Sequence, residues 1–351
     1  MSHRDMASAC SIPVSTLKLY EDDKMEPSRI DGMSISQALR FPLDFFYGDN
    51  LVEVNPDHIS FRALRATPSK SKAAMSSVAS FSLEIVRWLE EKYKIPNNDL
   101  PDLSEYGPKE AAGILRSQWD LGLKAVSNLT HLLESKGVRM LSIHEEHRAI
   151  DAFSFFVDGT PFILTNIGKS AARNRFDVAH ELGHLVMHRG DRLKSPDAEK
   201  EADEFASCFL MPAEAVRTFG RPLMSPDSIV VLKKRWNVSA MAMNRRLHDL
   251  SIIDEWKYMR NVREMSSRGW NKSEPEDTPR ESSMIWDKVL RHMRSLGKGL
   301  PDIARDTRLP IDEIKAFIYA MGLMSAEDLV AFSGDRPIGA LKLSVIKGGK
   351  R

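Results

Sequence analysis

The chain has little cysteine: Cys10 and Cys208 are its two cysteines in 351 residues, and they lie far apart. That count excludes a disulfide framework of the kind that small secreted proteins use. No apolar run approaches the ~20 residues that a membrane-spanning helix needs. The polar N-terminus also lacks the pattern of a secretory signal peptide. We therefore expect a cytoplasmic protein that has no membrane contact.

The chain also has no large excess of positive or negative charge. Its 50 Lys and Arg offset 49 Asp and Glu to give a formal net charge of +1. Such a balance gives no overall field that attracts nucleic acid, so any contact with DNA depends on local patches. The sequence has no glycine-rich phosphate loop, no paired-cysteine zinc ribbon and no internal repeat. With 42% hydrophobic and 28% charged residues it is typical of a soluble globular chain of two or three domains.

The stretch from Arg175 to His188, RFDVAHELGHLVMH, predicts one helix that is bounded downstream by Gly190. Residues four apart lie on one helix face, so the rings of His180 and His184 can converge on one metal ion. Glu181 lies beside them and can act on a water at that ion without being a ligand. A pattern this short also arises by chance in helices whose histidines are capped or exposed.

A second helix is predicted from Glu199 to Pro212, where proline ends it. Its apolar residues recur at three- and four-residue spacing and define a buried stripe: Ala202, Phe205, Ala206, Phe209 and Leu210. Glu199 falls on this stripe, whereas Glu201 and Glu204 are expected to point to solvent. A buried carboxylate is costly unless its charge is compensated, and a zinc ion held by two histidines would do so. The alternative is a partly solvated first-turn acid that the helix dipole favours. We favour Glu199 as the third zinc ligand.

Together the motifs R-F-x-x-A-H-E-L-G-H-x-x-x-H and E-x-x-A-D-x-F-A-x-x-x-L-M-P resemble the ImmA/IrrE family of metallopeptidases, over roughly residues 137–254. The resemblance implies a zincin-like, gluzincin-type domain in which His180, His184 and Glu199 hold Zn²⁺. It implies Glu181 as the catalytic base. It also implies the substrate, a repressor protein with a helix-turn-helix.

Three further residues are candidates for supporting roles. Asp177 either accepts a ring N–H from a ligand histidine or is an exposed acid of the first turn. His188 lies one turn beyond His184, about 6 Å along the helix axis. It is therefore expected to support a ligand or to cap the helix end. A residue that stabilises the oxyanion is also expected, and His248 is the candidate.

Alternating apolar runs predict strands over residues 138–143, 152–157 and 161–165, with Asp158-Gly159 as a hairpin turn. Helices surround them, which predicts a mostly helical α+β fold with a small sheet. In proteases with this site, an edge strand beside the zinc pairs with the extended substrate backbone. Candidates for that strand are Phe162, Ile163, Leu164 and Thr165. A core strand that is paired on both sides is the equal alternative.

Residues 1–48 resemble the later part of a repressor-type helix-turn-helix, with a turn at Ser11 and Pro13 and a second helix over 14–21. In that motif the second helix enters the major groove, so Ser15, Thr16 and Lys18 would face the bases. The start of the motif is nearly missing, and five Lys/Arg against seven Asp/Glu give these residues a net charge of −2. DNA binding and a remnant used only for packing both stay open.

We predict five regions along the chain. They are a partial helix-turn-helix at 1–48, a connector with an amphipathic helix at 49–107, the metallopeptidase domain at 108–265, a flexible linker at 266–283 and a small helical accessory domain at 284–351. The apolar stripe of a helix at 76–93 packs either on the protease domain or on a second copy of the chain. Candidate partners are therefore a protein substrate, DNA and a homodimer mate.

Three hypotheses for function follow. The leading one is a zinc-dependent endopeptidase that regulates transcription by cleaving a repressor protein. The first rival is a DNA-binding transcriptional regulator whose metal site is structural or sensory. The second rival is a member of a toxin–antitoxin or phage-derived regulatory pair.

Overall fold

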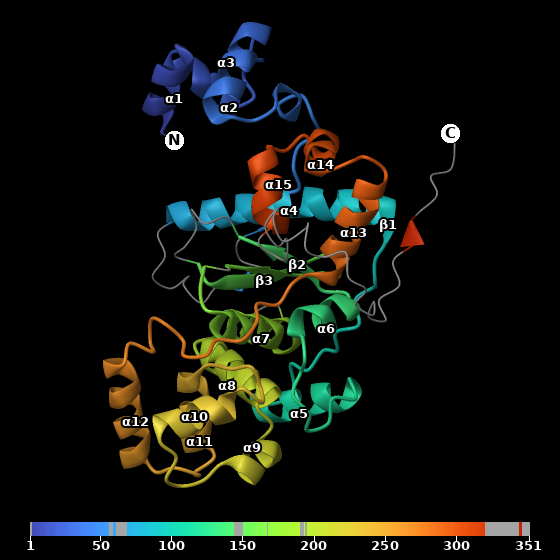
Figure 1. Ribbon diagram of the computed structural model, residues 1–351. Helices are drawn as coiled ribbons and strands as arrows, with labels where there is room; N and C mark the ends of the chain where they lie inside the picture. Colours follow the sequence, from blue (N-terminus) through green and yellow to red (C-terminus); the bar gives the residue numbers. More distant parts are fainter. Residues whose placement is uncertain are drawn as a thin grey trace.

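A three-stranded sheet lies between two helical layers in the computed structural model of the chain (Figure 1). The model describes residues 2–55, 59–60, 69–143, 150–166, 168–189, 193, 195–319 and 344–345. The prediction of a mostly helical α+β fold is confirmed. Among the described helices, none combines the length and apolar character needed to cross a bilayer.

The sheet consists of β2 (Arg139–Ser142), β3 (Ala152–Val157) and β4 (Thr160–Thr165), in the order β2-β4-β3. Strands β2 and β4 are parallel, and β3 and β4 form an antiparallel hairpin. Asp158 and Gly159 connect them with φ angles of 49° and 77°. Positive φ at both turn residues is the geometry that Asp-Gly favours, which confirms the predicted hairpin.

The candidate substrate strand is the central strand of the sheet. Phe162, Ile163, Leu164 and Thr165 each pair with β2 on one side and with β3 on the other. Because both edges of β4 are occupied, it has no free backbone groups for a substrate. The edge-strand hypothesis for these four residues is wrong, and the alternative of a core strand holds. The outer strand of the hairpin is β3.

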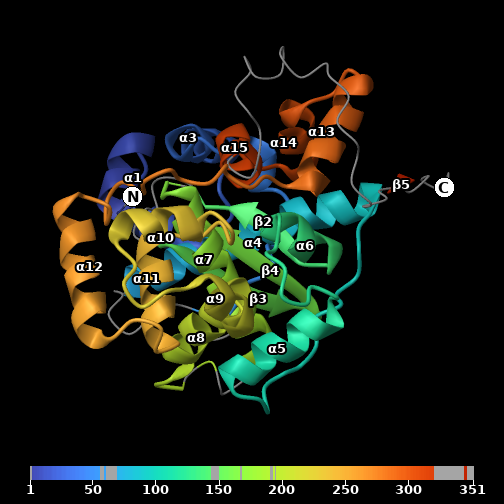
Figure 2. The same ribbon diagram turned by 60° about the horizontal axis from the view of Figure 1, so that its bottom comes forward.

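One face of the sheet carries the helices that hold the candidate site. Helix α7 (Ala171–Met187) crosses this face, α8 (Ala198–Leu210) packs on α7, and α5 (Pro108–Gln118) packs on α8 (Figures 1 and 2). Both site helices appear where the sequence predicts them, and the whole predicted stripe of α8 is buried. The layer is completed by α6 (Leu129–Ser135), α9 (Ala213–Phe219), α10 (Pro226–Lys233), α11 (Ala240–Asp249) and α12 (Glu255–Ser267).

The opposite face is covered by α4 (Ser69–Lys92) together with α13 (Met284–Ser295), α14 (Leu300–Thr307) and α15 (Ile311–Tyr319). Val78, Ile85 and Leu89 of α4 share one core with Phe153 and Phe155 of the sheet. The stripe of α4 therefore packs on the sheet of the same chain. The three C-terminal helices belong to the same core, so residues 284–319 are docked on the fold. Strands β1 (Tyr93–Lys94) and β5 (Ser344–Val345) form a separate antiparallel pair.

The segment at 266–283, which is predicted as a flexible linker, instead contacts the rest of the fold through its acidic side chains. Asp277 accepts hydrogen bonds from the first two N–H groups of α7, at 2.7 and 3.1 Å. Glu281 pairs with the buried Arg175, and Glu274 pairs with the buried Lys233 at 2.9 Å. The prediction of flexibility is wrong because these carboxylates do not face solvent but compensate buried charges.

An N-terminal unit lies at one end of the molecule (Figure 1). It contains α1 (His3–Cys10), α2 (Val14–Glu21), α3 (Arg29–Leu39) and the 3₁₀ turn η1 (Leu43–Phe45). Its own small core consists of Cys10, Ile12, Leu17 and Ile35. Helix α2 spans the predicted second helix. The rings of Phe41 and Phe45 lie 5.8 and 6.1 Å from that of Phe81 on α4, which joins the unit to the rest.

Candidate metal centre

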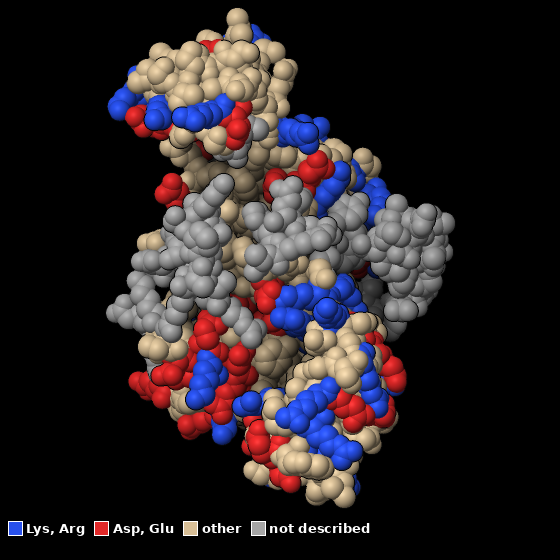
Figure 3. All heavy atoms as spheres, turned by 90° about the vertical axis from the view of Figure 1, so that its left-hand side faces the viewer, with Lys and Arg blue, Asp and Glu red and all other residues tan. Residues whose placement is uncertain are grey.

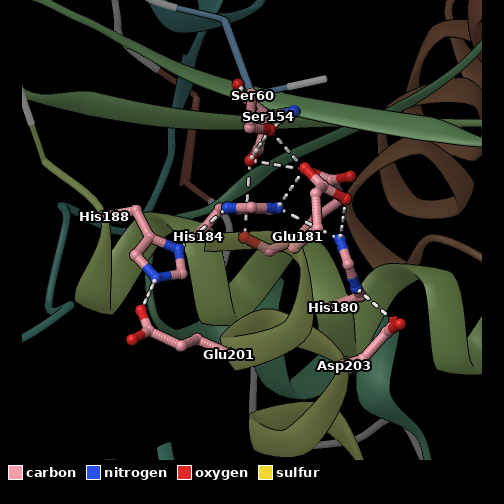
Figure 4. Close-up of polar contacts among 9 residues, drawn as sticks. Ser60, Ser154, His180, Glu181, His184, His188, Glu201 and Asp203 are labelled. Carbon is pink, nitrogen blue, oxygen red and sulfur yellow. Dashed lines mark hydrogen bonds and ion pairs between the residues drawn. The ribbon is translucent and has the colours of Figure 1, made fainter. Parts of the chain in front are cut away.

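Two histidines on α7 point their ring nitrogens at one place. His180 and His184 are one helical turn apart and both are buried. Their Nε2 atoms lie 3.0 Å from each other (Figure 4). Glu199, in the first turn of α8, brings its carboxylate oxygens to 3.4 and 3.5 Å from the two Nε2 atoms. The candidate ligand atoms of the three residues all lie within 4.8 Å of one another.

The residues present fit a divalent cation. Glu199 Oε2 is buried, yet among the described residues it has no hydrogen-bond partner. Buried carboxylate oxygens without a partner are rare and costly, and a cation at this point would satisfy the oxygen. Two imidazoles and one carboxylate are also the protein ligands of many catalytic zinc sites. The structure thus brings together the three residues that the sequence predicts as ligands.

The carboxylates around the cluster favour a positive charge at the histidines, which either a proton or a metal cation can supply. Burial alone would lower the pKa of His180, but the carboxylates of Asp203 and Glu199 outweigh it and raise that pKa to about 9. Burial would raise the pKa of Glu199, yet His180 and His184 hold it well below its usual range. A ligand imidazole is neutral, so a cation at this point would compete with a proton for His180.

The Nδ1 atoms of His180 and His184, which point away from the cluster, each have a polar partner. His180 Nδ1 lies 2.8 Å from Asp203 Oδ1. His184 Nδ1 lies 2.9 Å from His188 Nδ1, and His188 Nε2 lies 2.9 Å from Glu201 Oε2. Glu201 therefore favours the tautomer of His188 that carries its proton on Nε2, so its Nδ1 accepts the Nδ1–H of His184. When both imidazoles are neutral, this arrangement leaves the Nε2 lone pairs of His180 and His184 facing the cluster.

Some supporting residues differ from the expectations. Glu201 does not simply face solvent, because it contacts His188. Asp177 is buried and pairs with Lys169 at 3.3 Å, so the alternative of an exposed acid is wrong. Asp203 holds His180 instead. His188 supports a ligand, and its backbone N–H also ends α7 by donating to the carbonyl of His184.

His248, the candidate for stabilising an oxyanion, lies on α11. It pairs with Glu255 at 2.8 Å, and its ring stacks on that of Tyr258. None of the described contacts of the cluster involves it. We therefore retain no role for His248 at the site.

The carboxylate of Glu181 is buried beside the histidines and is held by two hydroxyl groups. Glu181 Oε2 accepts from Ser154 Oγ at 2.7 Å and from Ser60 Oγ at 2.6 Å (Figure 4). Ser154 belongs to β3, whereas Ser60 precedes α4 in the chain. Sequence reasoning missed both serines because nothing in their local patterns relates them to the motif on α7.

A cleft of about 1970 Å³ lies on the Asp203 side of His180, and its lining includes none of His180, Glu181, His184 and Glu199. Its wall includes Asp203 and Ser207 of α8, Phe176 of α7 and Arg245 of α11. Asp203 connects the cleft to the site because the same carboxylate contacts His180.

Residues 133–248 match the family model of the IrrE N-terminal-like domain, a peptidase family designated M78. The match shows that this part of the chain, about a third of its length, is similar to that domain. The match contains His180, Glu181, His184 and Glu199, and it confirms the resemblance that the two motifs indicate. No curated protein gives a significant match to the chain. The IrrE N-terminal-like domain is of a metallopeptidase family, which implies a metal ion and a protein substrate. The N-terminal unit lies outside the matched residues.

Proposed function

We propose that this protein is a zinc-dependent endopeptidase that regulates transcription by cleaving a repressor protein. The observation that carries the proposal is Glu181, a buried carboxylate between His180 and His184 on the helix. A metal site that is only structural has no use for a carboxylate there, whereas a hydrolase needs a base next to the ion.

The residues have separate roles in the proposed mechanism. His180, His184 and Glu199 would hold Zn²⁺, which would supply the Lewis acidity for hydrolysis at neutral pH. Glu181 accepts the proton of the attacking water and donates it to the leaving amine. Ser154 donates to Oε2 of Glu181 and fixes its orientation. Asp203 and the pair His188–Glu201 orient the two imidazoles.

The repressor substrate rests on the family resemblance, which points to a helix-turn-helix protein. A cytoplasmic location goes with such a substrate. The N-terminal unit supports a place among transcriptional proteins, and it exposes apolar side chains such as Ile30 and Met33 on α3. Repressor-type units of this kind commonly pair, so a homodimer through this unit belongs to the proposal.

The test is the substitution Glu181→Gln, which keeps the shape of the side chain and removes its basicity. A general base contributes about 10²–10⁴ in rate, so the variant should keep zinc and fold but lose nearly all cleavage. The assay follows a co-expressed candidate repressor by intact mass, with wild type and variant at equal zinc content. Glu204→Gln, on the outer side of α8, is the matched control and should cleave as wild type does.

If Glu181→Gln supports the same regulatory output as wild type, the protease mechanism is wrong. The rival of a metal-holding DNA-binding regulator then takes its place. A toxin–antitoxin or phage-derived pair differs in the partner and not in the chemistry, and the mass of the cleaved protein identifies that partner.

A further inference from the structure

Ser60 is held against β3 by hydrogen bonds to the backbone of Ser154. The N–H of Ser60 donates to the carbonyl of Ser154 at 2.9 Å, and the N–H of Ser154 donates to Ser60 Oγ at 3.0 Å. Both serines are buried. Because Ser60 Oγ accepts the N–H of Ser154 with one of its lone pairs, its own hydroxyl proton is free to point to another acceptor.

The nearest acceptor is the carboxylate of the proposed catalytic base. Ser60 Oγ lies 2.6 Å from Glu181 Oε2, and Ser154 Oγ lies 2.7 Å from the same oxygen (Figure 4). The two hydroxyl oxygens lie 2.8 Å from each other, so for both of them the contact with Glu181 is the shorter one. Hydrogen bonds to an ionised oxygen are also stronger than those between neutral groups. Both hydroxyl protons are therefore best placed on Glu181.

Both hydroxyl groups contact one oxygen of the carboxylate. Among the described residues, the hydrogen bonds of the Glu181 side chain are those made by Oε2. An ionised carboxylate has about four lone-pair sites on its two oxygens, so the two serines fill those of Oε2 and leave those of Oε1 open. An open lone pair is what a general base needs in order to take a proton from water.

We propose that Ser60 is a positioning residue for the catalytic base, and that Oε1 of Glu181 is the atom that takes the proton. Together, Ser60 and Ser154 hold the carboxylate in one orientation, with Oε1 available to the attacking water. Ser60 precedes the matched residues 133–248, so the catalytic apparatus extends beyond them. This inference rests on the proposed peptidase function and adds a residue to its mechanism.

A kinetic comparison of zinc-loaded full-length proteins tests the catalytic part of the proposal. Ser60→Ala removes the hydroxyl and should lower kcat on fluorescently labelled casein about 10–100-fold, the range that orienting partners at a metal site contribute. KM and zinc content should stay as in wild type, because the change leaves the proposed zinc ligands in place. Ser60→Thr keeps the hydroxyl and should stay close to wild type in kcat.

Ser82→Ala is the matched control. Ser82 is a buried serine of α4 whose hydroxyl donates to the carbonyl of Ala79 in the same helix, so its loss should leave kcat unchanged. A hydroxyl that only satisfies a buried carboxylate would support the fold without affecting kcat. An unchanged kcat in Ser60→Ala, or an equal fall in Ser60→Thr, would therefore overturn the proposal.

A spectroscopic measurement separates this inference from the peptidase function. In the metal-free full-length protein with ¹³C in the side-chain carboxyl groups of glutamate, the resonance of Glu181 is the one that Glu181→Gln removes. Ser60→Ala and Ser154→Ala should each shift this resonance, whereas Ser82→Ala should leave it in place. A resonance that does not move in Ser60→Ala would overturn the proposal even if the protein is a peptidase. A shift in that variant, with no cleavage by wild type, would instead contradict the peptidase function and with it the catalytic role of the contact.

Discussion

At the scale of single residues, three carboxylates in the first turns of α8 contact three imidazoles. Two of the imidazoles lie on α7 and the third belongs to the residue that follows this helix. Glu199 faces His180 and His184, Asp203 contacts the far side of His180, and Glu201 contacts His188. Ligand and orienting groups thus come from the same short segment of helix. A shift of α8 would therefore change ligation and orientation together.

We expect about one zinc ion per chain, held by His180, His184 and Glu199. Replacing any of the three with Ala should abolish tight binding, because each removes one of three protein ligands. Glu204→Ala is the control, since Glu204 is on the same helix but pairs with Lys109 at the surface. Metal analysis after dialysis measures the outcome. Full zinc content in Glu199→Ala would exclude Glu199 as a ligand.

The contact between Glu201 and His188 gives a second prediction. Glu201→Gln should weaken zinc binding about 10–100-fold, because it loosens the tautomer control of His188 and through it of His184. The number of sites at saturating zinc should stay the same. Competition with a chelating dye measures the affinity, with Glu204→Gln as the control. Unchanged affinity would mean that Glu201 only faces solvent, as its position off the apolar stripe of α8 suggests.

Sequence spacing finds the site residues that share a helix. His180, Glu181 and His184 follow from one motif, and Glu199 follows from the apolar stripe of its own helix. Asp203 lies one turn after Glu199, so the same helical spacing could have indicated it. Ser60 could not be found in this way, because it lies 121 positions from Glu181 and is brought there only by the tertiary fold.

At the scale of elements, the site depends on how closely α7 and α8 approach. Gly183 lies between the two histidines, and a Cβ there would come within 3.0 Å of the Phe205 ring and 3.4 Å of Ala202 Cα. The absence of a side chain at this position lets α8 pack close enough for Glu199 to reach the histidines. Helix–helix distance is therefore part of the ligand geometry.

Gly183→Ala should destabilise the protein by about 1–3 kcal/mol, because the added methyl group overpacks the α7–α8 contact. It should also weaken zinc binding by displacing Glu199. Gly113→Ala is the matched control: Gly113 is inside α5, and a Cβ there meets nothing within 4 Å. That change should be neutral or stabilise by up to about 1 kcal/mol. Denaturant unfolding of the metal-free proteins compares them, and equal losses in both would argue against the close contact.

The elements whose bounds were predicted well have a clear periodic pattern of apolar residues. The wrong prediction of a flexible linker at 266–283 has a physical cause. Strand β3 and helix α2 have the predicted bounds because alternation or helical spacing is clear in the sequence. Residues 274–281 are acidic and few are apolar, which favours a solvated linker. Their carboxylates are instead partners of buried basic groups and of the start of α7, and composition alone does not reveal such partners.

Glu134 of α6 is a buried carboxylate at the start of α13. Its buried carboxylate accepts hydrogen bonds from Ser283 and from the first N–H groups of α13. Burial raises its pKa from 4.5 to about 7, so the folded state holds a proton that the unfolded state releases at lower pH. The resulting penalty for folding grows as pH rises from 4.5 to about 7 and is constant above that.

The protein should therefore be more stable at pH 6 than at pH 8, with Glu134 contributing about 1 kcal/mol of the difference. Glu134→Gln cannot ionise, so the variant should lose that part. Denaturant unfolding of both proteins at the two pH values checks this. The same pH difference in wild type and variant would remove Glu134 as its source.

At the scale of the whole molecule, the N-terminal unit is the part whose role the sequence leaves most open. Its surface in Figure 3, at the top of the view, is largely uncharged, with basic and acidic side chains mixed along the lower border. Ser15 and Lys18 on α2 are exposed and Thr16 is half-buried, so the predicted base-reading residues can in part reach a partner. The net charge of −2 over residues 1–48 nevertheless opposes a polyanion.

We therefore expect the isolated chain to bind DNA weakly, with a dissociation constant no tighter than about 10⁻⁶ M at physiological salt, the range of non-specific binding. Fluorescence anisotropy with duplex DNA over a range of salt concentrations measures this. Lys18→Ala and Lys24→Ala each remove one positive charge, but Lys18 is exposed on α2, whereas Lys24 follows the helix and pairs with Asp22 at 2.8 Å. Similar small losses in both are expected if the contact is only electrostatic. Tight binding to one sequence that Lys18→Ala abolishes and Lys24→Ala preserves would show instead that α2 reads bases, and the unit would then be a working DNA-binding domain joined to the peptidase.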